Sequence, residues 1–110
     1  MARYTRKNEF RMDLNKKHYG KDKKPHPAYI FAQNGNFYRA NTITHSLYTT
    51  TGEHTRRINE NPNKNKGQTK KYSRVSPAFW QHKKMFSNKK LNNYSYNQKS
   101  IDRIISFNKF

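Results

Sequence analysis

The sequence contains no cysteine, and this absence removes several classes of protein at once. Disulfide bonds, thiolate metal sites and cysteine nucleophiles are excluded. Acidic residues are scarce and stand singly along the chain, whereas a two-metal nuclease needs clustered carboxylates to hold its ions. The five histidines match no zinc-binding spacing, and no glycine-rich phosphate loop or nucleophile elbow is present. We therefore expect no metal and no cofactor.

Long apolar runs are also missing. No stretch approaches the roughly 20 apolar residues of a membrane-spanning helix. Residues 1–24 carry charge throughout, unlike a secretory signal, so a cytoplasmic protein is expected. With 110 residues, of which 31% are hydrophobic, the chain is long enough for a single small domain.

Positive charge is present in large excess. Lys and Arg together number 24 against six Asp and Glu, which gives a formal net charge of +18. Self-repulsion of this size destabilises a compact state unless a polyanion neutralises it. The phosphate backbone of a nucleic acid is the usual partner, and RNA is preferred here. The alternative is a solvated basic surface that binds polyanions only adventitiously.

One window of the chain, residues 25–48, contains a single basic residue and no acidic residue. Within it, residues 28–33 and 36–44 are rich in aromatic and β-branched side chains. Asn34-Gly35 lies between these segments and suits a two-residue type I′ turn. The window therefore predicts a core β-hairpin.

The flanking regions are more polar. Residues 1–24 form a basic N-terminal arm, for which a short strand and a segment that orders on binding are both open. Residues 49–72 have the composition of an exposed, flexible polar loop. Residues 73–110 are expected to be a largely helical C-terminal part that begins with a strand ending at Val75.

Two helices are predicted in that C-terminal part. Ser76-Pro77 has the residue types of a helix start, with serine as N-cap and proline at the first helical position. Further on, a helix beginning at Asn97 or Ser100 is indicated by isoleucines at helical spacing. The predicted fold class is therefore mainly β (α+β), with a C-terminal helix packed on the sheet and basic, flexible extensions.

The hairpin also brings candidate catalytic groups together. A metal-free ribonuclease needs a base for the 2′-hydroxyl proton, an acid for the leaving oxygen, and cations or hydrogen-bond donors for the phosphate. In an idealised register, His26 falls opposite Ile43 and close to Thr44 and His45. Two imidazoles and the hydroxyls of Thr44 and Ser46 then converge at one end of the hairpin. The alternative is that these are ordinary surface residues of a strand end.

The order of residues in this hairpin has a parallel in a known family. The residues that carry it are His26-Pro27-Ala28-Tyr29-Ile30-Phe31, Gln33-Asn34, Gly35-Asn36-Phe37-Tyr38 and Ile43-Thr44-His45-Ser46. They resemble the first core hairpin of the MazF/PemK-like toxins, over about 20 of the 110 residues. The resemblance implies a small SH3-like β-barrel with a C-terminal helix. It also implies a ribosome-independent endoribonuclease, usually dimeric and inhibited by a cognate antitoxin.

The resemblance further implies roles for particular residues. Thr44 matches the family's catalytic threonine, and His26 stands where the family has an arginine that acts as acid or base and holds phosphate. Histidine exchanges protons near neutral pH more readily than arginine does, but it lacks the permanent charge and fork of donors that grip phosphate. His26, Thr44 and His45 are the catalytic candidates. The nucleic-acid-binding candidates are Arg39, Ser46, Arg56, Arg57, Lys64, Lys66, Lys70 and Lys71.

Three functional hypotheses remain open. The first is a metal-independent endoribonuclease of toxin–antitoxin type, with an acidic antitoxin-type protein and a second copy of the chain as partners. The second is a non-catalytic nucleic-acid-binding accessory protein of a phage or other mobile element, and the third is a ribosome-associated protein. Phe37, Tyr38 and Trp80 are candidates for stacking on unpaired bases, although a place in the core is the favoured interpretation for Phe37 and Trp80.

Overall fold

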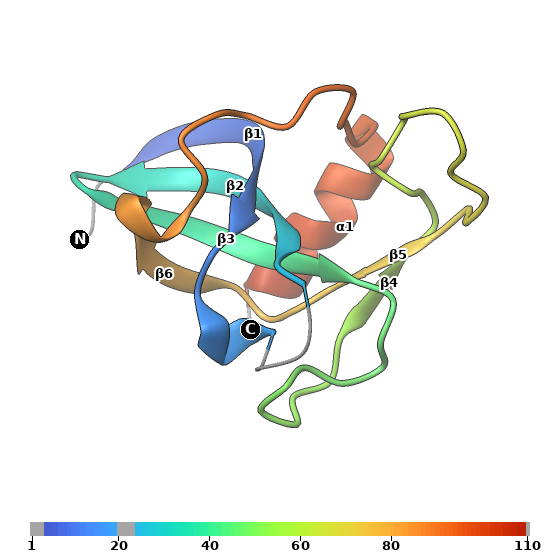
Figure 1. Ribbon diagram of the computed structural model, residues 1–110, viewed down its shortest axis with the longest axis horizontal. Helices are drawn as coiled ribbons and strands as arrows, with labels where there is room; N and C mark the ends of the chain where they lie inside the picture. Colours follow the sequence, from blue (N-terminus) through green and yellow to red (C-terminus); the bar gives the residue numbers. More distant parts are fainter. Residues whose placement is uncertain (1–3, 20–23, 110) are drawn as a thin grey trace.

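The structure is a computed structural model of the chain, and it describes residues 4–19 and 24–109. Within these residues, six strands form one sheet and a single α-helix follows them. In chain order the elements (Figure 1) are β1 (Thr5–Asp13), η1 (Lys16–His18), β2 (His26–Asn34), β3 (Phe37–Thr44), β4 (Arg56–Ile58), β5 (Ser73–Val75), β6 (Phe79–His82), η2 (Lys83–Met85) and α1 (Gln98–Asn108). The prediction of a mainly β fold with a C-terminal helix is confirmed.

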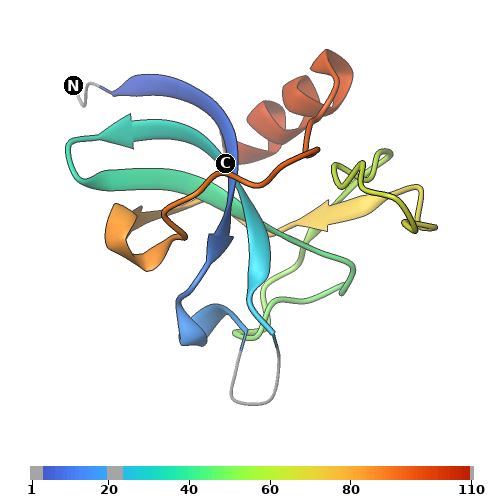
Figure 2. The same ribbon diagram turned by 45° about the horizontal axis from the view of Figure 1, so that its top comes forward.

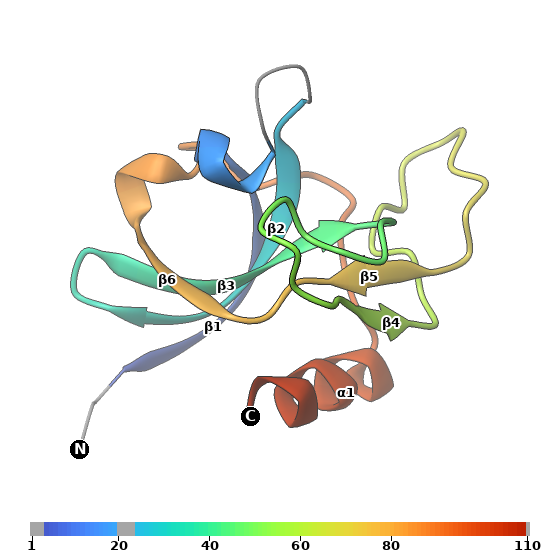
Figure 3. The same cartoon turned by 90° about the horizontal axis from the view of Figure 1, so that it is seen from below.

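All strand pairs are antiparallel, in the order β1-β2-β3-β5-β4, and β6 pairs with the first half of β3. Figure 3 shows β1, β2, β3 and β6 curling around a common interior. The chain after β6 returns to β1, where the N–H of Ser87 donates to the Met12 carbonyl at 3.0 Å. Among the described strands the ladder itself is not closed, so an SH3-like barrel stays a prediction.

The predicted hairpin is present, but its turn lies one residue further along the chain. Asn34 pairs with Phe37, so the turn residues are Gly35 and Asn36. Gly35 has a φ of +58°, whereas Asn36 does not have a positive φ. A positive φ at the first central residue alone is the requirement of a type II′ turn, so the predicted type I′ turn is wrong.

The shifted turn and a β-bulge in β2 change the register of the hairpin. Ala28 pairs with Thr42. Continuing this spacing sets His26 opposite Thr44, whereas the prediction set it opposite Ile43. The observed register therefore brings His26 and Thr44, the two principal catalytic candidates, closer together than the idealised register did.

The described part of the predicted N-terminal arm is a strand of the sheet. Of the two alternatives that the sequence left open, residues 5–13 take the first, forming β1 and pairing along β2. The physical reason is burial, because Phe10 is 4% exposed and its ring lies 5.1 Å from that of Tyr29. Residues 1–3 and 20–23 of the predicted arm lie outside the described residues.

The region predicted as a flexible polar loop, residues 49–72, contains strand β4. Ile58 and Pro62 are fully buried in it. Its polar composition has a local cause, since the side chains of Asn61 and Asn63 accept hydrogen bonds from backbone N–H groups two residues on. These asparagines indicate turns, but they do not show that the turns pack against the rest of the molecule.

The helix predicted from Ser76-Pro77 is wrong. Residues 79–82 form β6 and pair with β3. Gln81 is buried and Trp80 is exposed, which is the alternation of a strand. The Ser76 hydroxyl accepts a hydrogen bond from the N–H of Thr42 at 2.9 Å, so it fixes a crossing against β3 instead of capping a helix.

The C-terminal helix is confirmed, and α1 spans Gln98–Asn108. The side chain of Asn97 caps it by accepting from the N–H of Ser100 at 2.9 Å. Ile104 is fully buried against the sheet. Figures 2 and 3 show α1 and η1 on opposite sides of the sheet. In the described part of the chain, no helix has the length and apolar character needed to cross a membrane.

Two hydrophobic clusters lie on the two faces of the β2–β3 hairpin. Tyr29 and Ile43 belong to the cluster beneath α1, which also contains Ile104. Ile30 and Ala40 belong to the second cluster, which fills the curled interior. One face of the sheet is therefore covered by α1, and the other face packs against itself because the sheet curls.

Candidate active site

A pocket of about 790 Å³ opens where the curled interior reaches the end of β3, beside η1. Side chains alternate along a strand, so Thr42 and Thr44 continue the interior side of β3 and line this pocket. Other parts of the wall come from η1, the start of β2, the loop after β3 and the residues just before β6. The lining is rich in hydroxyl groups and includes His18 and His26.

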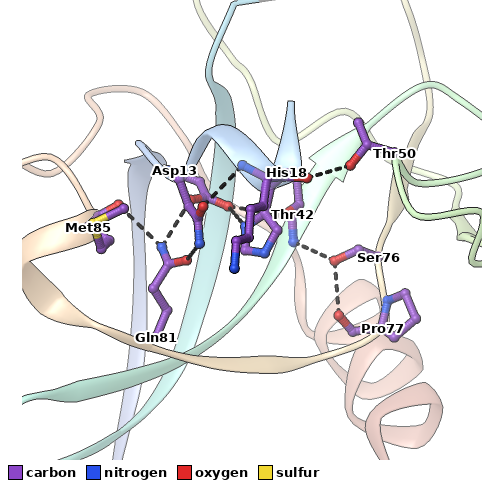
Figure 4. Close-up of polar contacts among 10 residues, drawn as sticks. Asp13, His18, Thr42, Thr50, Ser76, Pro77, Gln81 and Met85 are labelled. Atoms are coloured by element: carbon purple, nitrogen blue, oxygen red, sulfur yellow. Dashed lines mark hydrogen bonds and ion pairs between the residues drawn. The ribbon is translucent and has the colours of Figure 1, made fainter. Parts of the chain in front are cut away.

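A buried carboxylate lies beside the pocket. Asp13, the last residue of β1, is fully buried, and its Oδ2 lies 2.6 Å from Nδ1 of His18 (Figure 4). A carboxylate accepts hydrogen bonds, so Nδ1 of His18 donates to it and Nε2 is left to exchange a proton. The His18 ring also packs against Phe79, with ring centroids 4.5 Å apart. This is the arrangement that orients a catalytic imidazole.

Three further groups hold the Asp13 carboxylate (Figure 4). Nε2 of Gln81 donates to Oδ1 at 2.9 Å, and the N–H of Asn15 donates to the same oxygen at 3.0 Å. The Thr42 hydroxyl donates to Oδ2 at 3.4 Å. The Gln81 amide is itself fixed, because its oxygen accepts from Nδ2 of Asn15 at 2.9 Å. A buried carboxylate with this many donors has one orientation, and it transmits that orientation to His18.

Two of the predicted catalytic residues, His26 and Thr44, line the pocket. His26 is the cross-strand partner of Asp13, so both pocket histidines come from positions next to the same carboxylate. The Thr44 hydroxyl oxygen accepts from the N–H of Ser46 at 3.2 Å, which leaves its proton to be donated. Ser46 also lines the pocket, as a phosphate-contacting hydroxyl would.

The third predicted catalytic residue, His45, does not line this pocket. Its Nε2 lies 2.9 Å from the carbonyl oxygen of Tyr72, and its ring meets the Tyr72 ring edge-on at 5.2 Å. It borders a second pocket of about 310 Å³, to which His26 and Thr44 also contribute. The reason is strand geometry, because neighbouring residues point to opposite faces and Thr44 takes the interior one.

His18 was missed by the sequence reasoning, which treated each carboxylate as isolated. The signal that would have found it is Asp13 at the end of an apolar-patterned segment, with Asn15 and then His18 following closely. Asn15 caps η1 by accepting from the N–H of Lys17 at 3.1 Å, and this short helix turns His18 back onto Asp13.

The predicted nucleic-acid-binding cations lie elsewhere. Arg39 stands five residues before Thr44 on β3, about 16 Å away and on the other face of the strand. Lys64 forms an ion pair with Glu60 at 2.6 Å and is therefore partly neutralised. Within the described part of the chain, none of these predicted cations lines the large pocket: Arg39, Arg56, Arg57, Lys64, Lys66, Lys70 and Lys71. The pocket takes its positive charge from Lys17 and Lys24 instead.

Two of the predicted cations, Arg57 and Lys70, lie over one aromatic ring, that of Tyr72. Arg57 lies over the Tyr72 ring at 4.2 Å, and Lys70 lies 5.9 Å from the same ring. Arg56 lies over Phe107 of α1 at 5.3 Å. These contacts make a basic surface beside the smaller pocket, not a phosphate grip at Thr44.

Among the described residues that line the large pocket, Glu53 is the acidic residue and Tyr48 is the phenol. Glu9, Tyr29 and Tyr96 have shifted pKa values but are not part of this lining. Burial alone would raise the pKa of Glu9, but hydrogen bonds and charge from Lys7 and Arg11 outweigh it and lower that pKa. Burial raises the pKa of Tyr29 to about 12 and also raises the pKa of Tyr96. The carboxyl is thus held as an anion in ion pairs, and the phenols keep their protons at neutral pH.

In the part of the chain that the structure describes, no group of three or more histidine and acidic side chains is placed to hold a metal ion. The fold and pocket thus define a small basic protein with a curled antiparallel sheet and a polar pocket containing an Asp–His pair. Comparisons of the chain with family models, with curated proteins and with solved structures gave no match.

Proposed function

We propose that the protein binds RNA and cleaves it without a metal ion, with the large pocket as its catalytic centre. The observation that carries the proposal is the Asp13–His18 pair at 2.6 Å in a pocket that His26 also lines. A second support is the net charge of +18, which favours a polyanionic substrate.

In the proposed reaction, Nε2 of His18 takes the proton of a ribose 2′-hydroxyl, and Asp13 stabilises the imidazolium that forms. The 2′-oxygen attacks the adjacent phosphorus, so an O2′–P bond forms while the P–O5′ bond breaks. His26 gives a proton to the leaving 5′-oxygen. The products are a 2′,3′-cyclic phosphate and a free 5′-hydroxyl, and the proton count balances between the two histidines.

The phosphate needs donors where negative charge develops. Lys17 and Lys24 supply charge in the pocket, and the hydroxyls of Thr44 and Ser46 supply hydrogen bonds. This set replaces the arginine that the MazF/PemK-like family has at the position of His26. Flexible lysines hold phosphate as point charges and without the fixed fork of an arginine, so a less rigid grip follows.

The resemblance of the hairpin to MazF/PemK-like toxins supports a toxin–antitoxin role for this ribonuclease. On this proposal the chain adopts the SH3-like barrel plan of the family and acts in the cytoplasm. It forms a homodimer, and an acidic antitoxin-type protein inhibits it by covering the basic surface.

One observation favours a second candidate function, that of a non-catalytic nucleic-acid-binding accessory protein. The basic cluster of Arg57 and Lys70 around Tyr72 lies outside the large pocket and needs no chemistry to bind a polyanion. On this alternative the Asp13–His18 pair is a structural support for the end of β1.

The deciding experiment is cleavage of a long single-stranded RNA in EDTA by the wild type and by His18→Ala, His26→Ala and Thr44→Ala. His45→Ala is the matched control, because it removes an imidazole that does not line the pocket. Discrete cuts with cyclic phosphate ends, lost in the three pocket variants and kept in the control, support the proposal. RNA that stays intact while all five proteins bind it leaves the accessory-protein function.

A further inference from the structure

The outer face of β3 and β6 exposes large aromatic side chains. Phe37 is 47% exposed and Trp80 is 39% exposed, and Tyr4, just before β1, is 55% exposed. The sequence favoured a place in the core for Phe37 and Trp80, and this interpretation is wrong. Tyr38, the third stacking candidate, is the buried one.

These side chains form one continuous surface. Phe37 pairs with His82 across the strands, and their rings lie 5.3 Å apart. Arg39 pairs with Trp80, and its guanidinium lies 5.5 Å from the Trp80 ring. Tyr4 completes the row, edge-on to Trp80 at 6.4 Å. We call Tyr4, Phe37, Arg39, Trp80 and His82 the outer aromatic surface.

Strand alternation explains why this surface is on the outside. Along β6 Gln81 is buried while its two neighbours point outward, and along β3 Tyr38 and Ala40 are buried while Phe37 and Arg39 point outward. An outward face normally takes polar side chains. Here the outward positions carry flat rings with π-faces, one of them already in contact with a cation.

The charge around the surface favours a negatively charged partner over a basic or neutral one. Lys83 and Lys84 follow His82 directly and are exposed. Glu9, the acidic residue in the middle of β1, is buried and paired with Lys7 and Arg11. Rings interleaved with uncompensated cations are the components of a site for single-stranded nucleic acid, where bases stack and phosphates meet the cations.

We propose that the outer aromatic surface binds single-stranded RNA by stacking unpaired bases on Trp80, Phe37 and Tyr4. The inference deepens the proposed function and rests on the RNA binding in it. The surface is distinct from the catalytic pocket, because Arg39 lies about 16 Å from Thr44 along β3. It acts as a substrate-holding site beyond the point of cleavage, and it selects unpaired strands because a duplex hides its base faces.

The first test uses Trp80 itself, which is the only tryptophan of the chain and so reports on this surface alone. The probe is a 2′-O-methyl oligouridylate of about ten nucleotides, within the range that single-strand-binding folds cover. Its blocked 2′-oxygen prevents cleavage by the proposed mechanism. Saturable quenching of Trp80 fluorescence by this probe, absent with an abasic strand of equal length, supports stacking. Equal responses to both strands, or none to either, overturn it.

The second test measures the affinity of the same labelled probe for variants by fluorescence anisotropy. Trp80→Ala and Phe37→Ala should each weaken binding about tenfold. Ile105→Ala on α1 is the control, because Ile105 is also 39% exposed and should leave affinity unchanged. Unchanged affinity in folded Trp80→Ala and Phe37→Ala overturns the proposal. If either variant does not fold, the fluorescence test on the wild type still decides the question. If the wild type cleaves RNA but the fluorescence of Trp80 does not respond, only the proposal of an outer binding site is overturned. If the fluorescence of Trp80 responds saturably but RNA is not cleaved, only the proposal of a ribonuclease is overturned.

Discussion

The two ends of strand β3 both depart from the usual arrangement of apolar residues inside and polar residues outside, but they do so differently. At its C-terminal end, polar groups of Asp13, His18 and Thr42 lie in or beside the pocket, with Asp13 fully buried among hydrogen-bond donors. At its N-terminal end, the rings of Phe37 and Trp80 face outward where polar side chains are expected. Burying polar groups and exposing aromatic rings are both unfavourable, and a stable fold needs neither. One strand thus positions a polar pocket suited to chemistry at one end and an aromatic surface suited to binding at the other.

The largest expected difference between the two ends is in catalysis. His18→Ala should lower the rate of RNA cleavage by about 10²- to 10⁴-fold, because the pocket loses the imidazole that Asp13 orients. Trp80→Ala, at the other end, should keep the cleavage rate at saturating RNA close to that of the wild type. Single-turnover cleavage in EDTA measures both rates. Equal losses in the two variants would remove the division between a catalytic and a binding end.

The next largest difference is in stability. Asp13→Ala should reduce the free energy of unfolding by about 3 kcal/mol, because it removes the buried acceptor that the Gln81 amide, the Asn15 N–H and the Thr42 hydroxyl share. Asp13→Asn, which keeps an acceptor oxygen, should cost less. Chemical denaturation of the three proteins measures these values. A loss below about 1 kcal/mol for Asp13→Ala would contradict the central role of the carboxylate at this end of the sheet.

Changes on the outer aromatic surface should affect stability much less. Phe37→Ala and Trp80→Ala should each change the free energy of unfolding by about 1 kcal/mol or less, because the rings are already exposed and lose only edge and cation contacts. The same denaturation experiment gives these values. A loss comparable to that of Asp13→Ala would mean that the rings support the sheet and were not placed for a partner.

The smallest effect concerns a carboxylate that belongs to neither end. Burial would raise the pKa of Glu60, but hydrogen bonds from Lys64, the Asn97 N–H and Ser100 outweigh it and lower that pKa below its ordinary value of 4.5. Its stabilising contribution is therefore present above that ordinary value and is lost as the pH falls through the lowered pKa. Glu60→Gln should be less stable than the wild type at pH 7, and the difference should disappear once the pH has fallen below the lowered pKa of Glu60.

Unfolding of Glu60→Gln is best compared with that of Glu53→Gln, whose carboxylate is exposed. The control should show no such pH-dependent difference from the wild type. A difference for Glu60→Gln that persists unchanged at low pH would show that Glu60 supports the start of α1 by its shape and not by its charge.

Several elements were predictable because their signals are local. The hairpin followed from aromatic and β-branched runs around a glycine, and α1 followed from Asn97 and the isoleucines at helical spacing. The segment after Ser76 misled for the same reason. A serine–proline pair indicates a helix start, whereas here the Ser76 hydroxyl accepts a hydrogen bond from a strand that precedes it by more than thirty residues.

The candidate site was predictable only in part. His26 and Thr44 come together because they lie on two strands of one hairpin, and hairpin pairing can be counted from a turn. His18 joins them through its contact with Asp13 and its packing on Phe79, which no count from a turn reveals. The cations expected to bind phosphate beside Thr44 lie on other faces. The sequence could not predict this, because a net charge gives the number of cations and not their positions.

The sequence by itself determined the large positive charge, the absence of cysteine chemistry, the core hairpin and the C-terminal helix. These depend on composition and on residues close together in the chain. Only the tertiary structure decided that β6 pairs with β3, that His18 meets Asp13, and that Phe37 and Trp80 face outward. Each of these depends on which strand lies beside which and on the register between them, and a shift of one residue reverses the face that every side chain of a strand presents.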